Sequence, residues 1–366
     1  MSDDRKNSRN SVYIIAEAGV NHNGNIEIAK RLIDVAAEAG ADAVKFQTFK
    51  AQKMISRQAP KAQYQKKGTA KTESQLEMVR KLELDEPAHR LLIEHCRLRG
   101  VQFLSTPFDF DSIDLLAKTF ALPCLKIGSG EMTNGPFLLK AAATGKRILL
   151  STGMSTLGEI EEALGVLAFG YTGSGLDASL KGFRAAFQAA RGQRALKENV
   201  KLLHCTSEYP APFEEVNLGV LKTMRLAFGL PVGLSDHTPG TAVSIAAAAL
   251  GAVVIEKHFT LDRNLPGPDH GASLEPDELK EMVKSIRQVE TALGGFLKIP
   301  TRSETKNRAA ARKSLVAARP IRRGDRFSSE NLAMKRPGTG ISPMDYWDLL
   351  EKSSDRDYAE DELIAK

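Results

Sequence analysis

The sequence has little cysteine, few aromatic residues and no long apolar run. Its three cysteines, Cys96, Cys124 and Cys205, form no CxxC pair and leave one unmatched, which argues against a disulfide framework and favours the reducing cytoplasm. No apolar stretch reaches the roughly 18 residues that a membrane span needs. Residues 1–12 are polar and lack the apolar core of a signal peptide. We therefore expect a disordered tail there and a cytoplasmic protein that makes no membrane contact.

Charge of one sign is not concentrated anywhere in the chain. The 366 residues carry a formal net charge of +6, which mildly favours anionic partners. However, the basic residues are scattered, and no basic block is interleaved with aromatic side chains, which make up 6% of the sequence. A nucleic-acid partner is therefore not expected.

What the sequence does contain is a repeated unit of eight short apolar runs, nearly all of which end in polar residues. The runs cover residues 13–17, 43–47, 101–106, 125–129, 148–152, 200–204, 232–237 and 253–258. Helical patterns separate them, and eight strands alternating with helices predict a (β/α)8 TIM barrel. Catalytic groups of this α/β fold lie at the carboxyl ends of the strands, so the same pattern indicates where chemistry would take place.

The barrel pattern does not fill the chain. It spans residues 13–297, close to the roughly 250 residues usual for the fold, with long connections at 50–86 and 171–199. The first is predicted to be a lid or edge loop of the active site, and the second is helical in composition. Residues 298–313 have few large apolar side chains and indicate a linker. Residues 314–366 form a second, small domain that is only marginally stable alone.

Two histidines at the ends of the last two predicted strands could bind a metal ion. Alternate residues of a strand point the same way, so Ser235 shares a face with His237, and Glu256 shares one with His258. These strands are neighbours in a barrel, so the imidazoles can meet at its mouth. Two imidazoles plus waters suit a divalent ion that polarises a carbonyl. The pattern also fits histidines that are only hydrogen-bonded within the barrel.

Two lysines lie inside apolar strands, where an unpaired ammonium group is costly. Lys45 and Lys126 therefore each require an anion. The phosphate or carboxylate of a small substrate would serve, and so would a carboxylate of Glu17, Glu131 or Glu256. Because burial lowers the pKa of an amine, a lysine that forms a Schiff base is a third interpretation.

Hydroxyl and carboxyl side chains follow several other strands. Ser151 begins the segment Ser-Thr-Gly-Met-Ser-Thr and could bind a phosphate at a helix N-terminus or simply cap the helix. Thr106 allows the same two interpretations. Glu17 ends the first strand and could act as a general base. Asp269 follows Pro-Gly-Pro, and this loop either holds it over the barrel mouth or forms an ordinary surface turn.

Together these segments resemble the sialic acid synthase (N-acetylneuraminate synthase) family. The matching strings are 16–24 (AEAGVNHNG), 45–48 (KFQT), 126–131 (KIGSGE), 204–210 (HCTSEYP), 235–238 (SDHT), 258–260 (HFT) and 266–269 (PGPD). Residues 314–366 resemble the SAF, or antifreeze-like, domain of the same family. The resemblance implies a metal-dependent condensation of phosphoenolpyruvate with an N-acylated aldose, which releases phosphate.

The resemblance also implies roles for individual residues. His237 and His258 would bind Mn2+ or Mg2+, and Arg336 would reach the sugar from a partner subunit, so that a domain-swapped homodimer is the working unit. The implied acid/base residues are Glu17, Glu131 and Glu256. The implied contacts to phosphoenolpyruvate are Lys45, Thr106, Lys126, Ser129, Ser151, Ser207 and Ser235. The implied contacts to the amino sugar are Gln47, Tyr209 and Asp269.

The acceptor sugar stays open at this point. N-acetylmannosamine, the first interpretation, its 6-phosphate, and the 2,4-diacetamido sugars that lead to legionaminate or pseudaminate all fit one mechanism. Ser207 stands where some members of the family carry Asn, and little chain remains after residue 364 for a final SAF strand. The competing interpretations are a Schiff-base pyruvate aldolase that uses Lys45 or Lys126, and a non-enzymatic sugar-binding protein.

Overall fold

The computed structural model describes residues 11–61, 74–173 and 177–365. The chain divides into two compact units between Gly294 and Gly295. The first unit holds the predicted barrel and the second holds the predicted small domain. None of the described helices is both long and apolar enough to cross a lipid bilayer.

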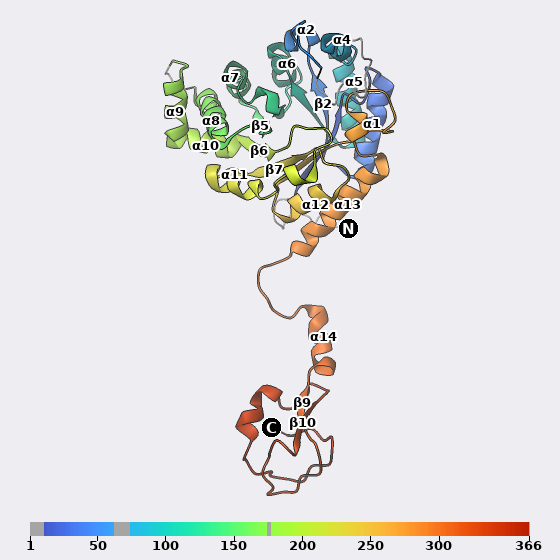
Figure 1. Ribbon diagram of the computed structural model, residues 1–366, viewed down its shortest axis with the longest axis vertical. Helices are drawn as coiled ribbons and strands as arrows, with labels where there is room; N and C mark the ends of the chain where they lie inside the picture. The colour runs from blue at the N-terminus through green and yellow to red at the C-terminus, as the bar shows by residue number, and fades with distance from the viewer. Residues whose placement is uncertain (1–10, 62–73, 174–176, 366) are drawn as a thin grey trace. The chain divides into compact units, whose positions relative to one another are not determined.

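Eight parallel strands form the centre of the first unit (Figure 1). They are β1 (Tyr13–Gly19), β2 (Ala43–Thr48), β3 (Gln102–Pro107), β4 (Cys124–Ile127), β5 (Arg147–Ser151), β6 (Val200–His204), β7 (Val232–Asp236) and β8 (Val254–His258). Their hydrogen-bonded order is β3-β2-β1-β8-β7-β6-β5-β4. The two ends of this order, β3 and β4, lie side by side, so the sheet closes as a TIM barrel and confirms the predicted fold.

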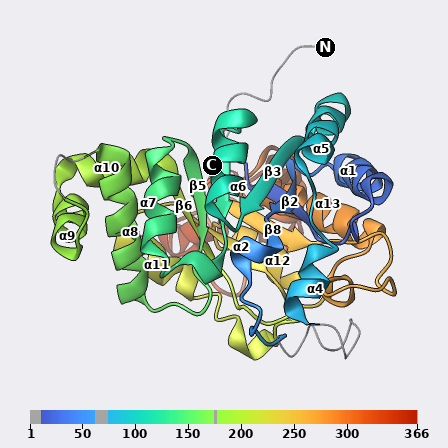
Figure 2. The same ribbon diagram turned by 90° about the horizontal axis from the view of Figure 1, so that it is seen from above.

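Helices surround the strands. The main ones are α1 (Ile26–Ala39), α5 (Glu86–Arg99), α6 (Phe110–Asp114), α7 (Gly135–Ala143), α8 (Leu157–Thr172), α11 (Val220–Phe228), α12 (Ala242–Ala249) and α13 (Pro276–Leu293). Figure 2 shows α1, α5 and α13 on one side of the strands and α8 on the other. The Asn25 side chain caps α1, and Gly40 and Gly100 end α1 and α5 with φ of 79° and 70°. These two glycines therefore end their helices as predicted.

Both long connections of the barrel contain helices of their own. The β2–β3 connection holds α2 (Ala51–Met54) and α4 (Gln75–Arg80), while residues 62–73 of this predicted lid or edge loop lie outside the described residues. The insertion at 171–199 holds α9 (Leu180–Gln188) and α10 (Ala190–Asn199), which pack against α8. The helical character predicted for this insertion is thereby confirmed.

Alternation along the strands produces an apolar layer inside the barrel. It consists of Ile15, Ala43, Leu104, Leu149, Leu203 and Val254, which we call the apolar floor. Two residues further along the chain from each of these stand Glu17, Lys45, Thr106, Ser151, Cys205 and Glu256, of which Cys205 lies just past the end of β6. Residues two apart in a strand point the same way, so these polar side chains stand directly above the apolar floor, toward the carboxyl ends of the strands.

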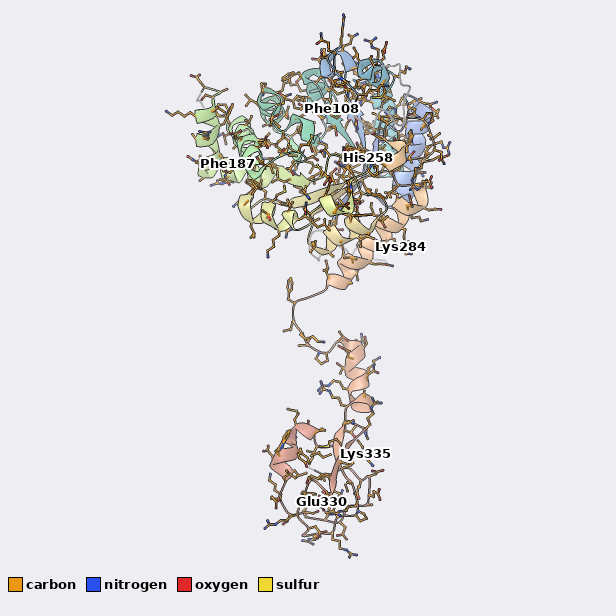
Figure 3. The ribbon with its side chains drawn as sticks, in the orientation of Figure 1. Phe108, Phe187, His258, Lys284, Glu330 and Lys335 are labelled. Atoms are coloured by element: carbon orange, nitrogen blue, oxygen red, sulfur yellow. The ribbon has the colours of Figure 1, made fainter. Side chains whose placement is uncertain are left out.

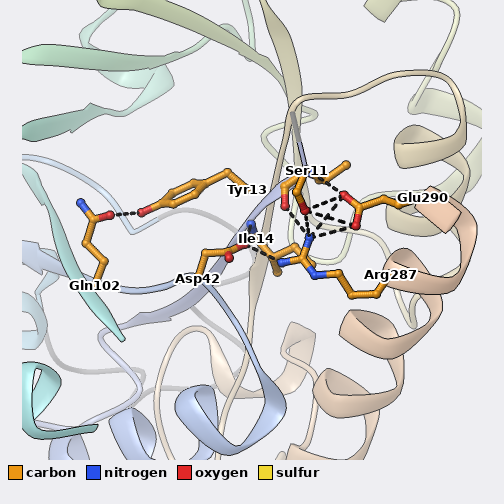
Figure 4. Close-up of polar contacts among 8 residues, drawn as sticks. Ser11, Tyr13, Ile14, Asp42, Gln102, Arg287 and Glu290 are labelled. Carbon is orange, nitrogen blue, oxygen red and sulfur yellow. Dashed lines mark hydrogen bonds and ion pairs between the residues drawn. The ribbon is translucent and has the colours of Figure 1, made fainter. Parts of the chain in front are cut away.

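Hydrogen bonds fasten the start of β1 to α13 (Figure 4). Arg287 of α13 donates to the Val12 carbonyl at 2.8 Å, and Glu290 accepts from Ser11 Oγ at 3.0 Å. Of the predicted disordered tail, residues 1–10 lie outside the described ranges. Residues 11 and 12, which the same prediction covered, are held against the helix.

The C-terminal unit is built on an antiparallel pair, β9 (Ser314–Ala317) and β10 (Leu332–Lys335). The predicted linker at 298–313 contains the helix α14 (Arg302–Ala311). The core of the unit consists of Leu315, Ala317, Ile321, Phe327, Leu332, Ile341, Tyr358 and Ile364. The Ile364 N–H donates to the Leu315 carbonyl at 3.0 Å, so the short C-terminal segment pairs with β9 in spite of its length.

Candidate active site

A cavity of about 600 Å³ opens at the carboxyl ends of the barrel strands. Of the barrel residues proposed from the sequence, it brings together Glu17, Lys45, Gln47, Thr106, Lys126, Ser129, Ser151, Ser207, Tyr209, Ser235, His237, Glu256, His258 and Asp269. Glu131 is not among its lining residues and instead accepts a hydrogen bond from Asn134 Nδ2 at 2.7 Å. Arg336 belongs to the C-terminal unit, where its Nε donates to the Ala311 carbonyl at 3.1 Å.

Two lysines and two glutamates form a buried charge network in this cavity. Lys45 Nζ lies 3.0 Å from Glu17 Oε2 and 3.4 Å from Glu256 Oε2. Lys126 Nζ lies 3.5 Å from Glu256 Oε1. Lys45 also donates to Thr106 Oγ1 at 2.9 Å. The buried ammonium groups are therefore paired with carboxylates, as one of the sequence interpretations required, but with Glu17 and Glu256 and not with Glu131.

The network gives its two glutamates different pKa values. Burial raises the pKa of Glu17 to about 7, although neighbouring Lys45 opposes this rise. Burial acts on Glu256 in the same direction, but Lys126 and Lys45 together hold its pKa well below the ordinary value. Glu256 is therefore the permanent anion of the network, and Glu17 is the carboxyl group able to exchange a proton near neutral pH.

Hydroxyl groups and a backbone amide gather beyond the ends of β4, β5 and β6. Ser129 Oγ accepts from the Gly153 N–H at 2.9 Å and lies 3.1 Å from Cys205 Sγ. A Cβ atom at Gly153 would stand 2.3 Å from Ser207 Oγ, so only glycine permits this close approach. Ser151 Oγ is buried and has no hydrogen-bond partner. Several donors are thus available here for an anion, and we call this group the anion pocket.

The two candidate metal ligands face the same space. The rings of His237 and His258 lie 5.6 Å apart, and the ring of Tyr209 lies 4.1 Å from that of His237. Figure 3 shows His258 at the centre of the barrel unit. His237 Nδ1 donates to the Thr206 carbonyl at 2.6 Å, which leaves Nε2 with a lone pair. His258 Nδ1 is buried and has no hydrogen-bond partner.

These imidazoles fit a divalent cation. Burial lowers the pKa of His237 to about 4 and that of His258 well below the ordinary value, so both rings are neutral at pH 7, as metal ligands must be. Within the described ranges, no three His, Cys, Asp or Glu side chains are grouped so that they could hold a metal. Two imidazoles without a third ligand of this kind would suit an open metal site and not a closed structural one.

The loop after β8 holds Asp269 in the cavity. Burial raises the pKa of its carboxyl group to about 6. Ser273 Oγ donates to the Asp269 carbonyl at 2.7 Å, and the neighbouring His270 is hydrogen-bonded to Thr260 Oγ1 at 2.6 Å. This loop is therefore a fixed part of the cavity rather than an ordinary surface turn.

The sequence predicted that residues 50–86 would form a lid or edge loop of the active site, but it did not identify which side chains line this side of the cavity. Eight apolar side chains form a hydrophobic cluster that also lines it: Val20, Phe49, Met54, Ile55, Met78, Val79, Leu82 and Phe108. We call this set the apolar wall. A signal for part of it was present, because Ser74 and Glu77 form a capping box in front of the apolar residues of α4, and such a box marks the start of a helix. Cys205 was missed as well.

Comparison with known proteins agrees with this geometry. Residues 32–298 match the NeuB family and residues 312–365 match the SAF domain. The chain is 53% identical to the N,N'-diacetyllegionaminic acid synthase of Campylobacter jejuni, over 96% of this chain and 98% of that protein. It is 44% identical to the protein of the same name from Legionella pneumophila, over 94% and 91% of the two chains.

A solved structure supports the same assignment. The N-acetylneuraminic acid synthetase of Leptospira borgpetersenii, in complex with citrate, superposes with a TM-score of 0.66 at 32% identity, over 81% of this chain and 90% of that one. The chain therefore belongs to the NeuB family, the phosphoenolpyruvate-dependent nonulosonic acid synthases, and its C-terminal unit is a SAF domain.

Proposed function

We propose that this protein condenses phosphoenolpyruvate with a 2,4-diacetamido hexose, releases phosphate and forms N,N'-diacetyllegionaminate or a very similar acid. The observation that carries the proposal is the similarity, over nearly the whole chain, to two synthases that are named for this product. The sequence alone put N-acetylmannosamine first and the diacetamido sugars second. The names of these relatives favour the reverse order.

Phosphoenolpyruvate would bind in the anion pocket, above the apolar floor. Lys126 supplies positive charge, and the hydroxyl groups of Ser129, Ser151 and Ser207 supply hydrogen-bond donors. The unpartnered Ser151 hydroxyl supports this placement, because a buried polar group without a partner is costly unless a ligand satisfies it. Lys45, Thr106 and Ser235 complete the proposed set of contacts.

His237 and His258 would hold Mn2+ or Mg2+, which supplies Lewis-acid activation of the sugar aldehyde. The Thr206 carbonyl fixes the tautomer of His237, and the Tyr209 ring beside it fixes the ring's orientation. The protein's part would thus be to keep two neutral imidazole rings oriented within one cavity. Gln47, Tyr209 and Asp269 would orient the sugar so that its aldehyde carbon faces the methylene carbon of phosphoenolpyruvate.

Glu17 is the residue we propose as the proton carrier. It lines the cavity 3.0 Å from Lys45, whereas Glu131 lies outside the cavity lining and is hydrogen-bonded to Asn134. Glu256 has a different task in this proposal. It accepts from Ser235 Oγ at 2.8 Å and pairs with both lysines, and so it holds the two ammonium groups in place for the anionic substrate.

The two competing interpretations lose support. Glu17 and Glu256 raise the pKa of Lys45 against the effect of burial, so this amine stays protonated and is a poor Schiff-base nucleophile. Membership in a family of condensing enzymes disfavours both the aldolase and a sugar-binding protein without activity. Burial lowers the pKa of Lys126, so the pKa argument does not apply to this amine, and the absence of borohydride trapping with pyruvate is the result we expect for it.

We further propose a cytoplasmic homodimer in which Arg336 of one subunit completes the cavity of the other. The support is the family resemblance of the Lys-Arg-Pro-Gly loop, together with the exposure of Arg336 on its own unit. All three cysteines are free thiols, which suits a reducing compartment. Mixing inactive His258→Ala and Arg336→Ala chains should restore part of the activity, because one hybrid cavity is then complete. No recovery in a verified mixed dimer would contradict the exchange.

The experiment that tests the proposed reaction is a phosphate-release assay with phosphoenolpyruvate and Mn2+. The acceptors are N-acetylmannosamine, its 6-phosphate and the 2,4-diacetamido hexose of legionaminate synthesis. We expect the diacetamido sugar to give the highest kcat/KM, and EDTA to abolish turnover. A higher kcat/KM for N-acetylmannosamine would overturn the proposed acceptor, and no phosphate release with any of the sugars would overturn the reaction.

A further inference from the structure

The apolar wall does not suit either charged part of the proposed reaction. Phosphoenolpyruvate presents a phosphate and a carboxylate, and the metal site presents imidazoles, so neither gains from a surface of aliphatic and aromatic side chains. Met78, Val79 and Leu82 nevertheless line the same cavity as Lys45 and His258. An apolar surface within a polar site binds an apolar group of the ligand, because its burial removes both surfaces from water.

The order of strands places this wall next to the sugar. Val20 follows β1, six wall residues belong to the β2–β3 connection, and Phe108 follows β3. The anion pocket, in contrast, follows β4, β5 and β6, and the two histidines follow β7 and β8. Gln47, a proposed sugar contact, lies on β2, in the same sector as the wall. A sugar that spans from the histidines to Gln47 therefore extends toward the wall and away from the anion pocket.

Polar groups suited to an amide line the same cavity as the wall. Ser56 and Gln75 line the cavity among the apolar residues of the β2–β3 connection. An acetamido group consists of a methyl group, which needs an apolar surface, and an N–H and a C=O, which need hydrogen-bond partners. A hydroxyl group on a sugar needs only hydrogen-bond partners and no apolar surface. The combination of an apolar surface and a few polar side chains thus matches an acetamido group better than a hydroxyl group.

The wall is well ordered for such a role. Met78 and Val79 lie on α4, which begins with the Ser74–Glu77 capping box. The rings of Phe49 and Phe108 pack edge to face with their centroids 6.2 Å apart. Side chains fixed by a capped helix and by ring packing lose little entropy on binding, so the wall can discriminate by shape.

From these observations we propose that the apolar wall binds the acetyl methyl of the second acetamido group and selects the 2,4-diacetamido acceptor over sugars with one acetamido group. The inference rests on the proposed function and adds the residues that decide the substrate. One methyl group in an apolar pocket changes kcat/KM by about ten- to a hundredfold, so the selectivity should have this size.

The test compares kcat/KM of the full-length enzyme for the 2,4-diacetamido hexose and for N-acetylmannosamine. Met78→Gln keeps the length of the side chain but places an amide against the methyl group. We expect its kcat/KM for the diacetamido sugar to fall at least tenfold, and that for N-acetylmannosamine to change by less than about threefold. Met154→Gln is the matched control, because Met154 lines the same cavity but is not part of the wall. For this control, the ratio of kcat/KM for the diacetamido sugar to kcat/KM for N-acetylmannosamine should stay at the wild-type value.

A second variant guards against a folding defect. Threonine has nearly the same shape as valine, so Val79→Thr should lower the ratio of kcat/KM for the diacetamido sugar to that for N-acetylmannosamine without unfolding the enzyme. The melting temperature of each variant is measured to check that it is folded. Equal losses for both sugars, or no loss for either in folded variants, would overturn the role of the wall. A wild-type enzyme that releases phosphate with neither sugar would instead overturn the proposed function, so the two failures are distinguishable.

Discussion

Lys257 Nζ lies 3.0 Å from Asp236 Oδ2, and both side chains are shielded from solvent. Asp236 also accepts from the Thr238 N–H at 2.9 Å and from Ser244 Oγ at 2.6 Å. The pair joins β7 to β8, since Asp236 and Lys257 are register partners in the ladder. Each residue directly precedes one of the two candidate metal-binding histidines, so the ion pair fixes the two strand ends that carry them.

Loss of one partner of this pair should strongly destabilise the barrel. Lys257→Met leaves the Asp236 carboxylate buried without its counter-charge, which costs about 3–5 kcal/mol of unfolding free energy. Urea unfolding measures this loss. The double variant Lys257→Met with Asp236→Asn should recover part of the stability, because it leaves no unpaired charge. A single variant that loses less than about 1 kcal/mol would contradict the role of the pair.

The substitution His258→Ala should abolish turnover while the fold survives. The side chain lies at a strand end above the apolar floor, and its Nδ1 has no protein partner to lose. Calorimetry should show the affinity for Mn2+ reduced at least tenfold, and circular dichroism should match the wild type. Turnover close to the wild type in saturating Mn2+ would defeat the assignment of the metal site.

A methyl group at Gly153 should impair binding of phosphoenolpyruvate selectively. The added Cβ would stand 2.3 Å from Ser207 Oγ and 2.9 Å from Ser129 Oγ, so these hydroxyl groups must move out of the anion pocket. We expect Gly153→Ala to raise the KM for phosphoenolpyruvate at least tenfold and the KM for the sugar by less than about twofold. Gly158→Ala is the control, because its Cβ would meet no atom closer than 3.9 Å.

Stability should decline in mild acid because of His22. This buried ring accepts from the Gly24 N–H through Nδ1, and burial lowers its pKa to about 4, with His89 and His270 adding to the effect. Below its ordinary pKa of 6.5, the unfolded chain takes up a proton that the folded chain refuses. The contribution of neutral His22 to the free energy of unfolding is therefore complete above pH 6.5 and is lost as the pH falls toward 4. The midpoint of urea unfolding should fall when the pH is lowered from 7 to 4.5. This fall should be smaller for His22→Asn than for the wild type.

The sequence predicts most of the barrel, because strand and helix patterns are local. The eight apolar runs, the ends of α1 and α5 at glycines, and the helices of the insertion all depend on neighbouring residues. The period of two along a strand likewise predicts which polar side chains share the barrel mouth. Glu17, Lys45 and Glu256 meet there for this reason.

The features of the site that the sequence does not predict depend on contacts between distant segments of the chain. The apolar wall combines residues after three different strands, and its members carry no common spacing that would reveal it. Glu131 follows a strand as the other candidates do, yet the helical turn at Ser129–Glu131 directs it to Asn134 and away from the cavity. The pair of Asp236 and Lys257 is hidden as well, because an outward-facing charge in a strand normally indicates solvent.

The apolar floor makes the cavity blind-ended. Even at Gly233 there is no room for a Cβ, which would stand 2.8 Å from Leu203 Cδ2 and 2.8 Å from Val254 Cβ, so nothing passes through the barrel from below. All molecules must enter and leave by one mouth. The anion pocket lies above this floor and the apolar wall comes from the loops at the rim, so a sugar seated first would block the path of phosphoenolpyruvate. Under the proposed placement of the two substrates, we therefore expect phosphoenolpyruvate to bind first and the sugar second.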